Sequence, residues 1–104
     1  MEDELYNVED AVAHIVTDFE NEGDFEFMGN DEIRRLTARL VAVDFAYMEE
    51  IGDDVYDEDA VYERLYAAAE ETSPQYKTYL MRFVDDYMDF MEQYLVSIGA
   101  VEWE

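Results

Sequence analysis

The chain of 104 residues has no cysteine, one histidine and four glycines. Without cysteine it has no disulfide, no thiol nucleophile and no thiolate metal ligand. The glycines stand apart, at positions 23, 29, 52 and 99, so no glycine-rich loop is present to cradle a phosphate. His14 is the only histidine, and neither Ser73 nor Ser97 stands in a nucleophile-elbow motif. We therefore expect that the protein is not an enzyme and holds no cofactor.

Basic residues are also scarce. Six Lys or Arg stand against 29 Asp or Glu, which gives a formal net charge of −23. Solubility alone requires a net charge of only about 2–8 in a small domain, and the self-repulsion of the excess opposes folding. Nucleic-acid phosphates and anionic membrane surfaces repel such a chain. The charge predicts a basic partner and no direct contact with nucleic acid or membrane.

Long apolar runs and a basic leader are missing as well. No run approaches the ~18 apolar residues of a membrane span, and residues 1–4 are acidic where a secretory signal is basic. Half of the residues are nevertheless apolar and 15% are aromatic, which is enough material for a core. We expect one domain over residues 1–104, located in the cytoplasm.

Four segments place apolar residues at intervals of three or four, the period of an amphipathic helix. The expected helices run from an Asn7 cap to about Gly23, from an Asn30 or Asp31 cap to Gly52, from about Asp57 through Ala69, and from Pro74, after a Ser73 cap, to Gly99. Met and aromatic residues at helical spacing in the last of them are typical of core. The fold class is predicted to be all-α, a compact four-helix bundle-like domain.

Two short segments alternate apolar and acidic residues, the period of a β-strand. They are residues 25–27 and 101–103. They either pair as a short two-stranded ribbon or pin two loops to the bundle by their aromatic rings. Both possibilities remain open at this point.

Two acidic patterns invite a metal interpretation. Asp10, His14 and Asp18 fall four residues apart, close to one helix face. The acidic run at 53–59 offers the oxygen ligands that Ca²⁺ prefers, but it lacks the glycine and the alternation of a calcium loop. We expect His14 to lie at the edge of the core, and we expect no dedicated metal site.

The charge is unevenly distributed along the chain. Residues 1–33 contain twelve acids and no Lys or Arg, and residues 44–63 contain nine acids and no base. Asp85, Asp89 and Glu92 repeat at about one carboxylate per helical turn, roughly 5 Å apart. A helix of about 25 residues would extend ~37 Å, close to one turn of B-form DNA at ~34–36 Å.

In composition, size and helix content the chain resembles the DNA-mimic inhibitors of phages and mobile elements, which block restriction enzymes, CRISPR effectors or repair glycosylases. The resemblance implies an inhibitor that occupies the DNA- or RNA-binding channel of a basic nucleic-acid-binding protein. The candidate partner-binding residues form three acidic clusters: Glu49, Glu50, Asp53, Asp54, Asp57, Glu58 and Asp59; Asp18, Glu20, Glu22, Asp24 and Glu26; and Asp85, Asp86, Asp89 and Glu92.

Three other hypotheses remain. The chain is similar in size and charge to small acidic helical immunity proteins, so it could neutralise a basic nuclease toxin. It could be a halophile protein whose acids serve solvation in strong salt, although its large apolar side chains fit poorly. It could also be a helical module that assembles with itself or with a basic client. Because each copy carries a charge of −23, we expect a monomer or a loose dimer.

Overall fold

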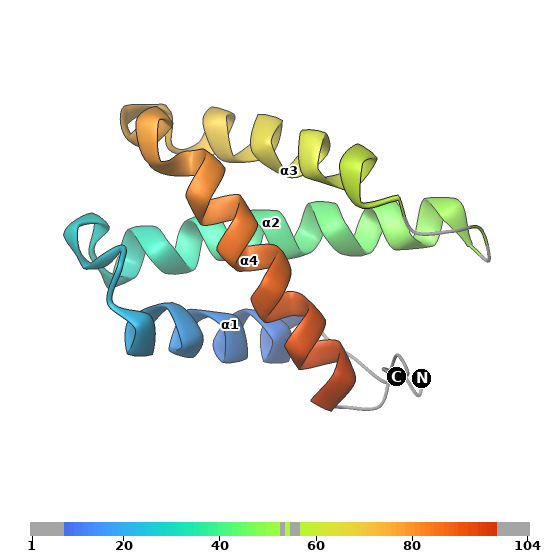
Figure 1. The fold of residues 1–104 in the computed structure, drawn as a ribbon, viewed down its shortest axis with the longest axis horizontal. Helices are drawn as coiled ribbons and strands as arrows, with labels where there is room; N and C mark the ends of the chain where they lie inside the picture. Colours follow the sequence, from blue (N-terminus) through green and yellow to red (C-terminus); the bar gives the residue numbers. More distant parts are fainter. Residues whose placement is uncertain (1–7, 53, 55–56, 98–104) are drawn as a thin grey trace.

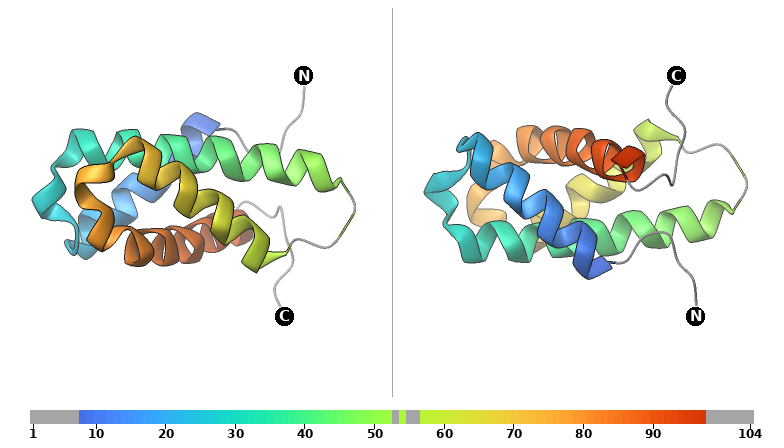
Figure 2. Two further views of the ribbon diagram at one scale, coloured as in Figure 1. Left: turned by 90° about the horizontal axis from the view of Figure 1, so that it is seen from above. Right: turned by 90° about the horizontal axis from the view of Figure 1, so that it is seen from below.

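Four helices surround one hydrophobic core, and each is the neighbour of the next in chain order (Figures 1 and 2). The computed structural model describes residues 8–52, 54 and 57–97. Its elements are α1 (Val8–Glu22), η1 (Glu26–Met28), α2 (Asn30–Ile51), α3 (Glu58–Thr72), η2 (Pro74–Tyr76) and α4 (Lys77–Ser97). α4 crosses in front of α2 and packs against both α3 and α1, which closes the bundle (Figure 1). The predicted all-α, four-helix bundle-like fold is confirmed.

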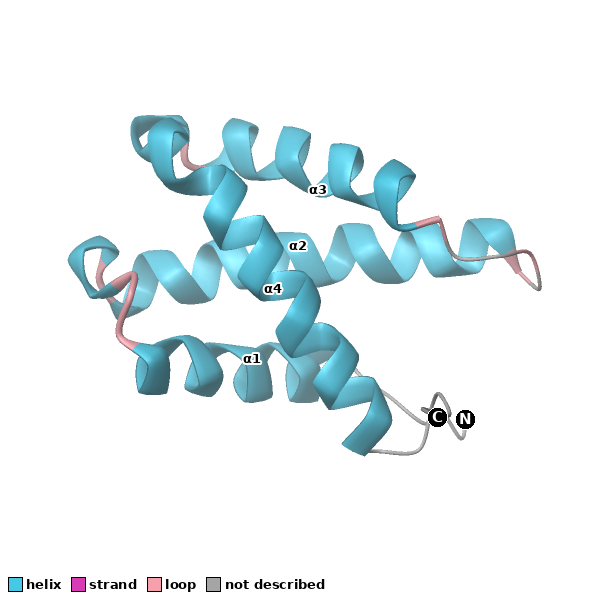
Figure 3. Cartoon of the chain, viewed as in Figure 1, coloured by secondary structure: helices cyan, strands magenta, loops and turns pink. Residues whose placement is uncertain are grey.

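Residues 25–27 are not a strand, so the ribbon alternative does not hold for this segment. Glu26–Met28 form the 3₁₀ turn η1, and no strand occurs in the described ranges (Figure 3). Phe25 is buried against the rings of Phe19 and Phe83, which holds the turn on the bundle. This agrees with the alternative in which an aromatic ring pins the loop. The other half, 101–103, lies outside the described residues.

The structure confirms the predicted start of α3 and corrects the predicted cap of α2. The third helix begins at Glu58, close to the expected start near Asp57, and Asp57 caps it, because its Oδ1 accepts hydrogen bonds from the amides of Asp59 and Ala60 at 3.0 and 3.3 Å. The prediction that Asn30 or Asp31 caps α2 is wrong, because Gly29 occupies the cap position with φ of 87°. Glycine adopts this conformation without a steric penalty, so the chain turns directly from η1 into α2.

α4 begins later than the sequence suggested. Ser73 makes no side-chain cap, and Pro74–Tyr76 form the 3₁₀ turn η2, so the α-helix starts at Lys77. Asn7 and Gly99, the outer limits expected for the first and last helices, lie outside the described residues. α4 has 21 described residues. This corresponds to about 31 Å, slightly less than one turn of B-form DNA at ~34–36 Å.

The core is rich in aromatic rings that join α1 to α4. Phe19 stacks on Phe83 with ring centroids 4.3 Å apart, and it meets Phe90 edge-on at 4.9 Å. Tyr87 is fully buried and donates its hydroxyl hydrogen to buried Asp44 at 2.8 Å. Asp44 therefore belongs to the core, although it lies in the acidic stretch 44–63. The core interpretation of the α4 stripe is confirmed.

No helix among the described ranges combines the length and the apolar character needed to cross a bilayer.

Candidate functional site

Most of the Lys and Arg side chains form ion pairs with Asp or Glu side chains of the same chain. Within the described residues, five of the six Lys and Arg side chains form ion pairs, and four of these pairs join different segments of the fold. The pairs are Arg35–Glu32 at 3.1 Å, Arg39–Glu71 at 3.8 Å, Arg64–Glu50 at 2.7 Å, Lys77–Glu70 at 3.2 Å and Arg82–Asp24 at 2.8 Å. Neither α1 nor the part of α4 after Arg82 contains Lys or Arg. Their carboxylates are therefore left without a cation on the same helix.

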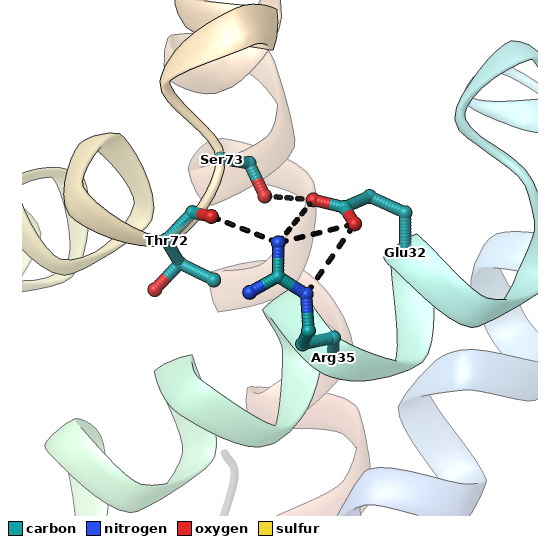
Figure 4. Close-up of polar contacts among 4 residues, drawn as sticks. All are labelled: Glu32, Arg35, Thr72 and Ser73. Atoms are coloured by element: carbon teal, nitrogen blue, oxygen red, sulfur yellow. Dashed lines mark hydrogen bonds and ion pairs between the residues drawn. The ribbon is translucent and has the colours of Figure 1, made fainter.

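Figure 4 shows the polar contacts of Arg35 where α2 meets the end of α3. The Arg35 guanidinium donates to the Glu32 carboxylate at 3.1 Å and to the carbonyl oxygen of Thr72 at 2.9 Å. The Ser73 hydroxyl donates to the same Glu32 carboxylate. This arginine satisfies a free carbonyl at a helix C-terminus, a structural role. It is not available to shield the acids of α1 and α4.

The first predicted cluster lies at the α2–α3 connection, and the structure gives two of its members structural roles. Asp57 caps α3, as described above. Glu50 accepts hydrogen bonds from Arg64, and this contact lowers the pKa of the Glu50 carboxyl. Asp53 lies outside the described residues. The remaining four are exposed and form the connection surface: Glu49, Asp54, Glu58 and Asp59.

The second and third clusters meet in space, although Glu22 and Asp86 are 64 positions apart in the sequence. Glu22 at the end of α1, Asp24 before η1 and Asp86 on α4 bring carboxylate oxygens within 4.8 Å of one another. Arg82, one turn before Asp86, neutralises Asp24. The separation would allow a shared cation, but exposed acids commonly gather in this way without one. We assign no metal to the group.

The crowding at this point alters two pKa values. The pKa of Glu22 is raised to about 7, first by partial burial of its carboxyl and then by hydrogen bonding and repulsion from Asp86. Burial likewise raises the pKa of Asp86, against the opposing effect of Arg82. Each of these two carboxyls therefore takes up a proton at a higher pH than an isolated carboxyl would. Like charges in close contact produce this response.

We expect the free energy of unfolding to rise when the pH is lowered from about 7.5 to about 5. Because the pKa of Glu22 is higher in the folded state than in the unfolded state, protonation of this carboxyl stabilises the fold. The stabilisation is complete below the ordinary pKa of 4.5 and is lost as the pH rises past about 7. Urea unfolding at the two pH values measures the difference. Glu22→Gln should reduce the difference in unfolding free energy between the two pH values. Glu20→Gln, a change of an exposed residue on the same helix, should leave that difference unchanged. An unchanged pH dependence in Glu22→Gln would contradict the assignment.

The other members of these two clusters are spread over several faces. Glu20, Glu26, Asp85 and Asp89 are exposed, while Asp18 and Glu92 are partly buried. Asp18 and Glu20 lie two positions apart on α1 and so point to different sides. Asp85 faces α3, where it contributes, after burial, to the raised pKa of Tyr62. The second cluster of the sequence is therefore not one continuous patch.

The row Asp10, His14 and Asp18 lies along α1, and its members have partners within the protein. Tyr94 on α4 donates its hydroxyl hydrogen to Asp10 at 2.9 Å. His14 Nδ1 lies 3.4 Å from the Asp18 carboxylate, and its ring lies 5.3 Å from that of Tyr94. These contacts place the row at the α1–α4 seam. Asp10 and His14 thus contact Tyr94 of α4, whereas Asp18 Oδ2 is buried without a hydrogen bond among the described residues.

Two acidic surfaces therefore result. The connection surface lies at the α2–α3 connection, and η1 lies at the opposite end of the long axis (Figure 1). The second surface, the η1–α4 edge, runs from η1 along α4 and is defined by Glu22, Asp24, Glu26, Phe27, Tyr79 and Asp86. Phe27 of η1 and Tyr79 of α4 belong to it because their exposed rings contact each other between the two elements, a feature that helical spacing did not reveal. Comparison with known proteins found no matching family model, no matching curated protein and no matching solved structure.

Proposed function

We propose that this protein binds a basic nucleic-acid-binding protein and inhibits it by occupying its DNA- or RNA-binding channel. The observation that carries the proposal is the distribution of charge in the fold. Five ion pairs hold cations in structural contacts, whereas the acids of α1, η1 and the second half of α4 are left largely unshielded. A summed negative potential of this kind steers a basic partner toward the surface.

The geometry of α4 supports imitation of a nucleic acid. Asp85, Asp89 and Glu92 follow one another along the helix at roughly one carboxylate per turn, or about 5 Å. Duplex DNA presents its charges more densely, about one per 1.7 Å of axis, so acids from α1 and η1 would supply the rest. The proposed targets are the enzymes that phage and mobile-element inhibitors block, such as CRISPR effectors and restriction enzymes. We place this activity in the cytoplasm.

Capture from a host lysate followed by competition tests the proposal. The full chain is immobilised, and bound proteins are eluted with salt or with duplex DNA or RNA. Mimicry predicts that a nucleic-acid-handling protein is captured, that nucleic acid displaces it, and that its affinity falls with salt. The protein must also inhibit the captured enzyme in proportion to occupancy. Capture of generic basic proteins alone would contradict the proposal.

A second candidate is an immunity-type protein that neutralises one basic nuclease. The exposed rings of Phe27 and Tyr79 favour it, because aromatic anchors are typical of dedicated protein interfaces. In this case a single nuclease is captured and nucleic acid does not displace it. The same elution experiment therefore separates the two functions.

A further inference from the structure

The η1–α4 edge exposes an aromatic pair that the core does not use. Phe27 is 54% exposed and Tyr79 is 48% exposed, and their ring centroids lie 4.7 Å apart. The half-buried ring of Tyr76 lies 5.9 Å from Phe27 on the same side. Burial of such rings by a partner releases water from apolar surface, which favours association. Aromatic residues are accordingly enriched at protein interfaces.

Arg82 follows this pair along α4, and carboxylates lie beyond it. Asp24 precedes Phe27 by three residues and pairs with Arg82, which follows Tyr79 by three residues. Next along the helix is Asp86, whose carboxylate meets those of Glu22 and Asp24. Tyr79 and Asp86 are two helical turns apart, about 10 Å along the axis. The edge thus has an aromatic end and an acidic end at a fixed separation.

We propose that the η1–α4 edge binds an extended basic segment of the partner protein. An apolar side chain of the segment packs on Phe27 and Tyr79, and an arginine about three residues further along pairs with Glu22 and Asp86, since an extended chain covers about 10 Å in three residues. The inference rests on the proposed function, because it specifies how the basic partner is held. It adds an apolar contact to what would otherwise be recognition by charge alone.

The negative charge of the edge favours a basic segment over other ligands that bind exposed aromatic rings. A nucleic acid or an anionic lipid would bring phosphates against Glu22 and Asp86, because Arg82, the cation of this edge, is already paired with Asp24. A second copy of this chain would bring the same carboxylates against themselves. Arginine fits best, because its planar guanidinium donates two parallel hydrogen bonds to a carboxylate and also stacks on aromatic rings.

Two short synthetic peptides test the inference on the full chain. Both have a glycine–serine background and two arginines, and one has a leucine three positions before them where the other has serine. Binding is followed at low salt by the backbone amide shifts of the isotopically labelled protein. We expect the leucine peptide to bind about fivefold more tightly and to shift the amides of Phe27 and Tyr79.

Phe27→Ser should abolish the preference for leucine. Val96→Ser, a matched change of an exposed apolar residue at the far end of α4, should retain it. Equal binding of both peptides to the unmodified protein, or a preference that survives in Phe27→Ser, would overturn the inference. Because lysate capture is measured separately, a captured enzyme without peptide discrimination removes this inference alone. Peptide discrimination with only generic proteins captured removes the proposed function and leaves the edge as a peptide-binding surface.

Discussion

Neutralising four acids along the η1–α4 edge and its next turn is expected to weaken partner binding about 100-fold, whereas neutralising the connection surface should weaken it less than about tenfold. The first variant combines Glu22→Gln, Glu26→Gln, Asp86→Asn and Asp89→Asn. The second combines Glu49→Gln, Asp54→Asn, Glu58→Gln and Asp59→Asn. Each removes four formal charges from a total of −23, so any difference between them reports position and not net charge.

The structure also protects this comparison from a folding artefact. Asp57 and Glu50 are left intact, because one caps α3 and the other pairs with Arg64. Replacing Glu22 and Asp86 relieves repulsion between α1 and α4, so the first variant should be at least as stable as the original chain. Affinity for the captured partner is measured by calorimetry at two salt concentrations. Equal losses in both variants would show that only total charge matters.

Helical spacing was sufficient to predict the main architecture. The 3.6-residue period places Val61, Leu65 and Ala68 on the buried face of α3, and these three are buried in the structure. The third helix was expected to begin near Asp57, and the structure agrees, because a carboxylate before a helix accepts its free amides. Such predictions rest on contacts within a few residues, which the local sequence contains.

The local sequence was misleading where tertiary contacts determine conformation. The alternation in residues 25–27 resembles a strand, yet Phe25 enters the core and η1 turns so that Phe27 remains outside. Ser73 resembles a cap, but its hydroxyl donates to Glu32, which is 41 residues away. In both cases a partner distant in sequence provides the interaction that decides the conformation.

The composition of the η1–α4 edge could not be predicted for the same reason. Glu22 and Asp86 were assigned to different clusters, and their contact depends on how α4 crosses α1. Asp57 and Glu50 were predicted to bind the partner along with their exposed neighbours, although both have structural roles. Net charge indicates the class of partner, whereas the arrangement of helices decides which carboxylates remain for it.

Phe25→Ala is expected to lower the free energy of unfolding by about 3–5 kcal/mol, the usual cost of removing a buried ring. Phe25 is only 2% exposed, and its ring meets those of Phe83 at 5.0 Å and Phe19 at 5.7 Å. Phe27→Ala, two residues away and largely exposed, should cost less than about 1 kcal/mol. Urea unfolding followed by circular dichroism measures both variants.

The same substitution links the core to the proposed binding surface. Phe25 anchors on Phe83 the segment whose Asp24 and Phe27 contact Arg82 and Tyr79 of α4, so its loss should weaken partner binding even at temperatures where the helices remain folded. Phe25→Leu, which retains most of the apolar volume, should recover stability to within about 2 kcal/mol of the original chain and restore most of the binding. If Phe25→Ala lost stability but kept full affinity, the partner would not depend on the position of η1. The connection surface, whose acids do not contact Phe25, would then be the better candidate.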